Sequence, residues 1–104
     1  MSIDGLKQEI VPKFVASGEQ KFYRSIIVLA LKKLVLIEKN LYKGLPPHLE
    51  YLEYYDQFII LYRREGDEVY LNIAKMLRKA AHRVYRIMLK KNMTAPHPKF
   101  LSLV

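Results

Sequence analysis

The stretch Ser25–Ile37, with the sequence SIIVLALKKLVLI, decides the fold of this chain. It is too apolar to stand in water and much longer than an ordinary strand of about five or six residues. On a helix turning by about 100° per residue, the polar side chains around it form one narrow seam of Lys21, Ser25, Lys32, Lys39 and Lys43. The remaining apolar arc is far wider than the roughly 100° stripe of a surface helix. The sequence therefore predicts a central helix covered on several sides, with Ile27, Leu31 and Leu34 in the core.

The ends of this central helix carry their own signals. Ser17 followed by Gln20 matches a capping box, in which the two side chains satisfy free N–H groups of the first turn. Gly44 is typical of the left-handed residue that follows a helix, and the proline pair at 46–47 prevents continuation. We therefore expect this helix to begin after Ser17 and to end near Gly44.

The composition narrows the classes of protein. A chain of 104 residues suffices for one domain, and its apolar content of 51% indicates an additional surface buried by a partner or by a second copy. The absence of cysteine excludes disulfides and cysteine-type zinc sites. A membrane span needs about 20 apolar residues, whereas Lys32 and Lys33 interrupt the apolar run here. The N-terminus lacks a secretory signal, so we expect an intracellular protein, cytoplasmic or nuclear.

The rest of the chain predicts three further helices. Residues 3–16 have apolar side chains at helical spacing, but Pro12 should kink this helix or break it into two short pieces. Helices are also expected at about 47–64 and 68–91, joined by a Gly66-Asp67 stop-and-start signal. Short connections between such segments predict an all-α, up-down-up-down bundle over residues 1–92, with a tail at 93–104. The alternative is a three-helix core with a loose N-terminal arm.

Tyrosines are concentrated in the predicted third helix. They pack in the core with their hydroxyls at its edge, or they form a patch that binds another protein. The candidates for such an aromatic patch are Tyr51, Tyr54, Tyr55 and Tyr62.

The net charge of +8 is unevenly distributed, because the eight lysines and arginines in residues 69–104 are accompanied by no acid. On the predicted fourth helix one side is apolar and the other is basic, and the basic face comprises Lys75, Arg78, Lys79, His82, Arg83, Arg86 and Lys90. Such a face suits an acidic surface of another protein or of a second copy, or the phosphates of a nucleic acid. Tyr85 is the one aromatic residue expected to stack on bases there.

Signals for catalysis are weak. The chain has no glycine-rich phosphate loop and no nucleophile elbow, and His48, His82 and His97 lie on three different segments. We therefore predict no catalytic residue, no metal site and no cofactor. The segment Ala81-His82 with Arg86 one turn later resembles the phosphoacceptor segment of histidine phosphotransfer domains, although Val84-Tyr85 replace the lysine-glycine pair of that family. The resemblance implies that His82 accepts a phosphoryl group.

These observations favour a non-catalytic protein–protein interaction module, an adaptor or assembly subunit, that uses the basic fourth helix and the tyrosine-rich third helix. Nucleic-acid binding through the phosphates is the second hypothesis, and histidine phosphotransfer is a lesser one. The terminal Ser102-Leu103-Val104 also resembles a C-terminal ligand of PDZ domains.

Overall fold

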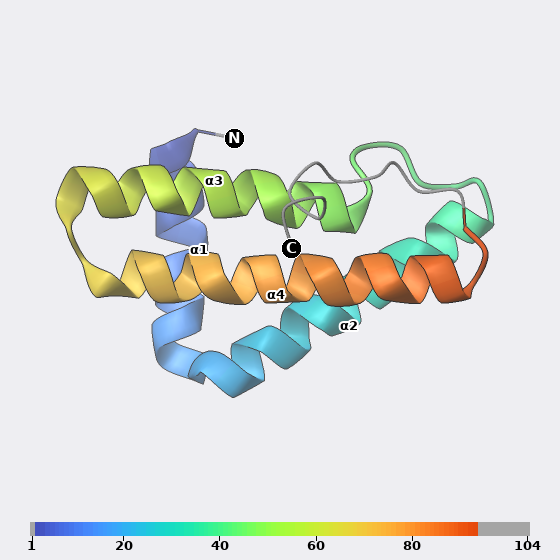
Figure 1. The fold of residues 1–104 in the computed structure, drawn as a ribbon, viewed down its shortest axis with the longest axis horizontal. Helices are drawn as coiled ribbons and strands as arrows, with labels where there is room; N and C mark the ends of the chain where they lie inside the picture. Colours follow the sequence, from blue (N-terminus) through green and yellow to red (C-terminus); the bar gives the residue numbers. More distant parts are fainter. Residues whose placement is uncertain (1, 94–104) are drawn as a thin grey trace.

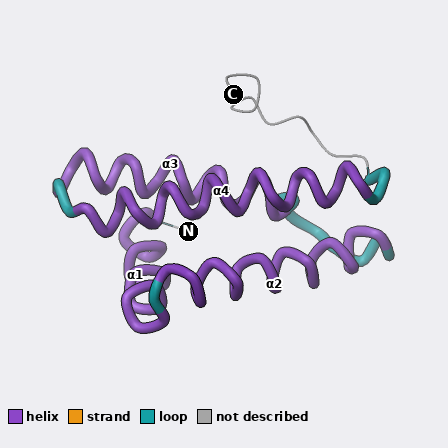
Figure 2. Tube along the Cα trace, turned by 60° about the horizontal axis from the view of Figure 1, so that its bottom comes forward, coloured by secondary structure: helices purple, strands orange, loops and turns teal. Residues whose placement is uncertain are grey.

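The computed structural model describes residues 2–93, and this part of the chain is helical without any strand. Four helices follow one another: α1 (Ile3–Ser17), α2 (Glu19–Glu38), α3 (Pro47–Glu65) and α4 (Glu68–Lys90). This confirms the predicted all-α bundle. Helices α2, α3 and α4 run in alternating directions along the long axis, whereas α1 crosses one end of the molecule (Figures 1 and 2).

Local capping signals set several helix ends, including the predicted stop and start at Gly66-Asp67. Ser2 accepts a hydrogen bond from the first turn of α1, and Asp67 does the same for α4. Pro47 is the first residue of α3, where its missing N–H group removes no hydrogen bond. Gly66 follows α3 with a left-handed φ of 75°, and its N–H group bonds to Tyr62. This turn makes α3 and α4 an antiparallel pair.

The central helix begins after Ser17 as predicted, but the predicted capping box and the predicted end near Gly44 are wrong. Ser17 is the last residue of α1, and Gly18 precedes α2 at φ 80° without any side-chain cap. A glycine accepts this backbone conformation, and it turns the chain sharply from α1 into α2. The helix also ends earlier than expected, at Glu38, because Asn40 takes the left-handed conformation with φ 56° before Gly44 is reached.

The first helix is a packed element rather than a loose arm. It runs without a break from residue 3 to residue 17 and includes Pro12, so the predicted break into two pieces does not occur. Leu6, Ile10 and Phe14 are buried along one side of it. Ion pairs also attach α1 to the end of α3: Lys7–Glu65 at 3.0 Å and Asp4–Arg64 at 3.3 Å.

The core is centred on α4, which packs most extensively on α3 and also contacts α1 and α2. Its apolar stripe is closed from water because small Ala74 and Ala80 let the neighbouring helices approach. The largest fully buried side chains come from all four helices and include Leu6, Leu34, Phe58, Leu61, Ile73, Leu77, Val84 and Met88.

The central helix α2 is covered on one side only, which corrects the prediction of cover on several sides. Ile27 and Leu34 are buried as expected, but Leu31 is 38% exposed. The outward side also leaves other apolar residues 41–52% exposed, namely Val28, Leu29, Val35 and Leu36. The other helices pack on the inner side of α2, so the wide apolar arc exceeds what they can cover.

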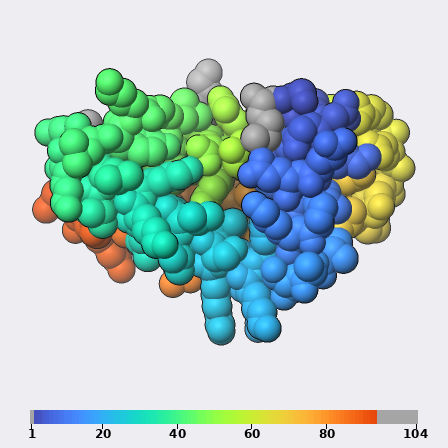
Figure 3. Space-filling view, turned by 180° about the vertical axis from the view of Figure 1, so that it is seen from behind, coloured from blue at the N-terminus to red at the C-terminus, as the bar shows by residue number. Residues whose placement is uncertain are grey.

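A hollow of about 250 Å³ lies between α1, α2 and α3, with α4 at its base. Figure 3 shows the opening from behind. Ile10, Phe22, Ile26 and Leu77 make much of its lining apolar. Lys33 on α2 and Glu50 on α3 also line it, and they form an ion pair of 3.0 Å between their helices.

None of the helices within residues 2–93 has the length and apolarity that crossing a membrane requires.

Candidate functional site

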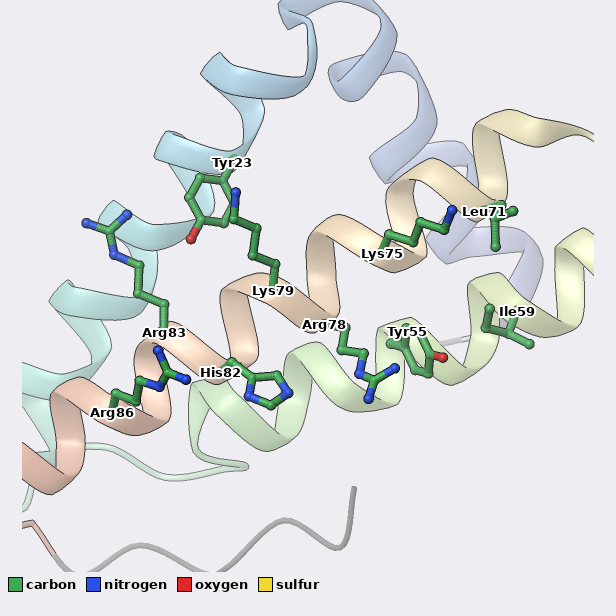
Figure 4. Close-up of a pocket in the computed structure, with 10 residues that line it drawn as sticks. All are labelled: Tyr23, Tyr55, Ile59, Leu71, Lys75, Arg78, Lys79, His82, Arg83 and Arg86. Carbon is green, nitrogen blue, oxygen red and sulfur yellow. The ribbon is translucent and has the colours of Figure 1, made fainter. Parts of the chain in front are cut away.

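The outer side of α4 forms a basic groove of about 680 Å³, which we call the α4 groove (Figure 4). Its position follows from the sequence of α4, in which apolar residues face α3 and the core while basic residues recur about one turn apart on the other side. Six of the seven predicted basic residues line the groove: Lys75, Arg78, Lys79, His82, Arg83 and Arg86. The seventh, Lys90, is exposed at the end of α4 and is not part of the lining.

Neighbouring helices supply the walls of the α4 groove. Tyr23 of α2 lies on one side, where its ring centroid is 5.0 Å from Lys79 Nζ and 5.9 Å from Arg83 Cζ. These cation–π contacts hold two of the cations in place. Tyr55 and Ile59 of α3 line the other side, and Figure 4 shows Arg78 and His82 directed toward α3. The groove therefore combines cations with apolar and aromatic walls.

Among residues 2–93 no acidic side chain lines the α4 groove. Two of the acids in this range form ion pairs elsewhere: Glu65 pairs with Lys7 and Arg64, and Glu38 pairs with Lys91 at 3.1 Å. Glu19 lines an adjoining depression beside Lys75 and Lys79 but forms an ion pair with neither of them. The described lining of the groove is therefore rich in positive charge.

The surroundings of His82 disfavour its protonated form. Burial lowers the pKa of His82, and the positive charges of Arg78 and Arg86 lower it further. A ligand carboxylate or phosphate in the groove would counter the effect of the two arginines. An anion bound in the groove would therefore favour protonation of His82.

The four predicted tyrosines do not form one patch. Tyr51 is buried and donates a hydrogen bond to the backbone carbonyl of Ile26, and burial raises the pKa of its phenol. Tyr54 lies beside it, with ring centroids 6.5 Å apart, and burial raises the pKa of Tyr54 to about 12. Tyr55 faces the α4 groove, whereas Tyr62 donates to Glu68 beside the turn between α3 and α4. Two of these tyrosines serve packing, and one belongs to the groove.

The aromatic residue expected on the basic face is instead part of the core. Tyr85 is buried, and its ring stacks on that of His48 with centroids 5.5 Å apart. Tyr23 supplies an aromatic ring to the groove, and our prediction missed it. Its position one turn into α2 carries no local signal, because only the packing of α2 on α4 brings it beside Lys79.

Among the described residues no group of three histidines, cysteines or acids could hold a metal ion. Two further predictions, His97 and the terminal residues Ser102–Val104, lie outside the described part of the chain.

Comparisons with protein-family models, with curated proteins and with solved structures find no match to this chain.

Proposed function

We propose that this chain is a non-catalytic helical interaction module that binds an acidic segment of another protein in the α4 groove. The observation that carries the proposal is the lining itself, in which six basic side chains are accompanied by no acid from residues 2–93. Successive cations of α4 are about one helical turn apart, a rise of about 5.4 Å. Carboxylates at the same spacing on an acidic helix can meet them in register.

The walls of the groove favour a protein ligand. Ile59, Leu71 and Tyr55 place carbon atoms beside the cations, and these can contact the apolar side chains of a bound peptide. A sugar–phosphate backbone offers little apolar surface for the two aliphatic residues. Charge complementarity would in turn raise the association rate and give a marked salt dependence.

Nucleic-acid binding is the second candidate, and the aromatic side chains of the groove favour it. Single-stranded nucleic acids bind to positive grooves in which bases stack on aromatic rings. Tyr23 of α2 and Tyr55 of α3 both line the groove beside the cations and offer two such rings. The ring of Tyr23 already makes cation–π contacts with Lys79 and Arg83, however, so a stacking base would have to displace them.

The test compares two labelled ligands on the full chain by fluorescence anisotropy. One is a Glu-rich helical peptide with leucines on one side, and the other is a mixed-sequence single-stranded oligonucleotide of equal charge. We expect the peptide to bind more tightly at about 150 mM salt. Tighter binding of the oligonucleotide, with a steep decrease in log affinity against log salt, would establish the second candidate instead.

Charge-reversal variants show whether the groove is the site. Lys79→Glu and Arg86→Glu together should weaken peptide binding at least tenfold, since each replaces an attraction with a repulsion. Lys43→Glu with Arg63→Glu, two exposed cations outside the groove, is the control with the same total change in charge. Equal losses in the groove variant and in the control would show that net charge alone governs binding, and the proposal would then be wrong.

A further inference from the structure

The outward side of α2 is a second surface with the properties of a docking site, and we call it the α2 face. Its apolar residues form two ridges on the helix, one of Val28, Leu31 and Val35 and the other of Leu29 and Leu36. All five are between 38% and 52% exposed. Contiguous apolar surface of this kind on a small protein usually marks an interaction site.

Three lysines lie along the line that divides the two ridges, with Lys32 between the ridges and Lys21 and Lys39 beyond either end. Lys21, Lys32 and Lys39 are exposed and fall within about 20° of one another around the helix axis. None of them forms an ion pair with a residue in the described range 2–93. The neighbouring Lys33, by contrast, points away from this line and pairs with Glu50. The α2 face is therefore an apolar surface with a line of cations along its middle.

The position of the lysines bears on which of three occupants the α2 face suits: a lipid surface, a second copy of the chain, or a helix of another protein. A lipid surface suits a helix whose charges are segregated from its apolar side, whereas here the lysines would point straight at the acyl chains. A second copy docked by the same face would bring lysines close to lysines, and like charges destabilise such contacts. A helix with carboxylates between its own apolar residues avoids both problems.

We infer that the α2 face binds an amphipathic helix of another protein, whose carboxylates lie in the middle of its apolar side. Lys32 and Lys39 are seven residues apart, so acids seven residues apart on the partner helix can pair with both. Apolar side chains on either side of these acids would pack on the two ridges. Ion pairs enclosed in this way fix the register and direction of the bound helix.

The hollow beside the α2 face provides a place for an anchor residue. Leu29 belongs to one ridge and also lines the hollow, together with Phe22, Ile26 and Leu77. An apolar side chain of the bound helix that projects past Leu29 can therefore enter a mostly apolar space. Interfaces commonly derive much of their affinity from one anchor of this type in a pocket.

The experiment uses two designed peptides on the full chain. Both have zero net charge and leucines flanking a central line, which carries glutamates at i and i+7 in one peptide and lysines in the other. Isothermal titration should show the glutamate peptide binding at least tenfold more tightly than the lysine peptide. The double variant Lys32→Glu, Lys39→Glu should reverse this preference, with an unchanged circular dichroism spectrum as the check on folding.

Two further measurements separate this inference from the proposed function. Lys79→Glu with Arg86→Glu alters the α4 groove and should leave the affinity for the zero-charge glutamate peptide unchanged. The double variant Leu31→Ser, Val35→Ser should weaken binding of the glutamate peptide at least fivefold, because most of one ridge is lost. Equal affinity for the two peptides would overturn the inference. The inference would also be wrong if light scattering showed a dimer that Lys32→Glu abolishes. It would be wrong as well if the chain bound phosphatidylserine vesicles and Lys32→Glu abolished that binding.

Discussion

Tyr51 shows how a polar group can be placed inside this small core. Its ring is buried, and its hydroxyl donates to the backbone carbonyl of Ile26 on α2, so the phenol links α3 to α2. Tyr62, also on α3, donates to Glu68 at an exposed position. The two hydroxyls therefore both donate a hydrogen bond, one to a buried backbone carbonyl and the other to an exposed carboxylate.

The variant Tyr51→Phe should lower the free energy of unfolding by about 1 kcal/mol, because it removes a buried hydrogen bond. Tyr62→Phe is the matched control and should change it by less than about 0.5 kcal/mol, as surface substitutions usually do. Urea unfolding followed by circular dichroism measures both values. Equal effects of the two substitutions would mean that the Tyr51 hydroxyl does not stabilise the packing of α3 on α2.

His82 predicts a pH dependence in the α4 groove. Because its pKa in the free protein lies below the ordinary value of 6.5, the imidazole is mostly neutral at pH 7. A bound carboxylate raises that pKa, so the complex takes up a proton and affinity for an acidic peptide should increase from pH 7.5 to pH 5.5. In His82→Gln this increase should disappear, which titrations at several pH values can measure.

The same histidine makes the stability of the free protein depend on pH, because folding disfavours its protonated form whereas peptide binding favours it. The unfolded chain, with a histidine pKa near 6.5, takes up a proton before the folded chain does as the pH falls. The free energy of unfolding should therefore decrease below about pH 6.5, by less in His82→Gln than in the natural sequence. A slope that is identical in both proteins would assign the pH effect to other groups.

At the scale of one helix, α2 has large apolar residues on both its buried and its exposed side. Leu34 is fully buried, whereas Leu36, two residues later, is 41% exposed. Leu34→Ala should cost about 2–5 kcal/mol, since it leaves a cavity beside α4. Leu36→Ala should cost less than about 1 kcal/mol. Thermal and urea unfolding of the two variants test whether α2 is covered on one side only, and similar losses would contradict it.

The corner between α1 and α2 gives a second test at this scale. Gly18 has φ 80° and ψ 162°, a region that side chains disfavour, although no atom would meet an added Cβ within 4 Å. Gly18→Ala should therefore cost about 1–3 kcal/mol through backbone strain alone. Ser17→Ala should be nearly neutral, because Ser17 does not cap α2. A large loss in Ser17→Ala would restore the capping box that the sequence suggested.

Helix ends were predictable where the signal is local. Pro47, Gly66 and Asp67 act within one or two residues of their own position, and the bounds of α3 and α4 accordingly follow the prediction closely. The end of α2 was not predictable in this way, since Asn40 and Gly44 can both adopt positive φ and the sequence does not rank them. Local chemistry identifies candidates, whereas packing of the whole chain selects among them.

For the whole molecule, the sequence predicted the basic residues of the α4 groove but not the residues of its walls. The basic residues share one helix face and follow from helical periodicity, but the walls come from residues distant in sequence. Tyr23 and Tyr55 reach the groove because α2 and α3 flank α4, and no pattern within either helix indicates this. The exposed α2 face was missed for the same reason, because a wide apolar arc does not specify which neighbours are available to cover it.

The central position of α4 has a consequence for how the protein is made. The helix that completes the core is the last of the four to leave the ribosome, so α1, α2 and α3 emerge before their main packing partner exists. Because synthesis proceeds at about 5–20 residues per second, the apolar side of α2 stays exposed on the nascent chain for seconds before α4 emerges. The core can therefore be completed only after α4 has emerged, and chaperones that bind apolar segments would find a substrate in that interval.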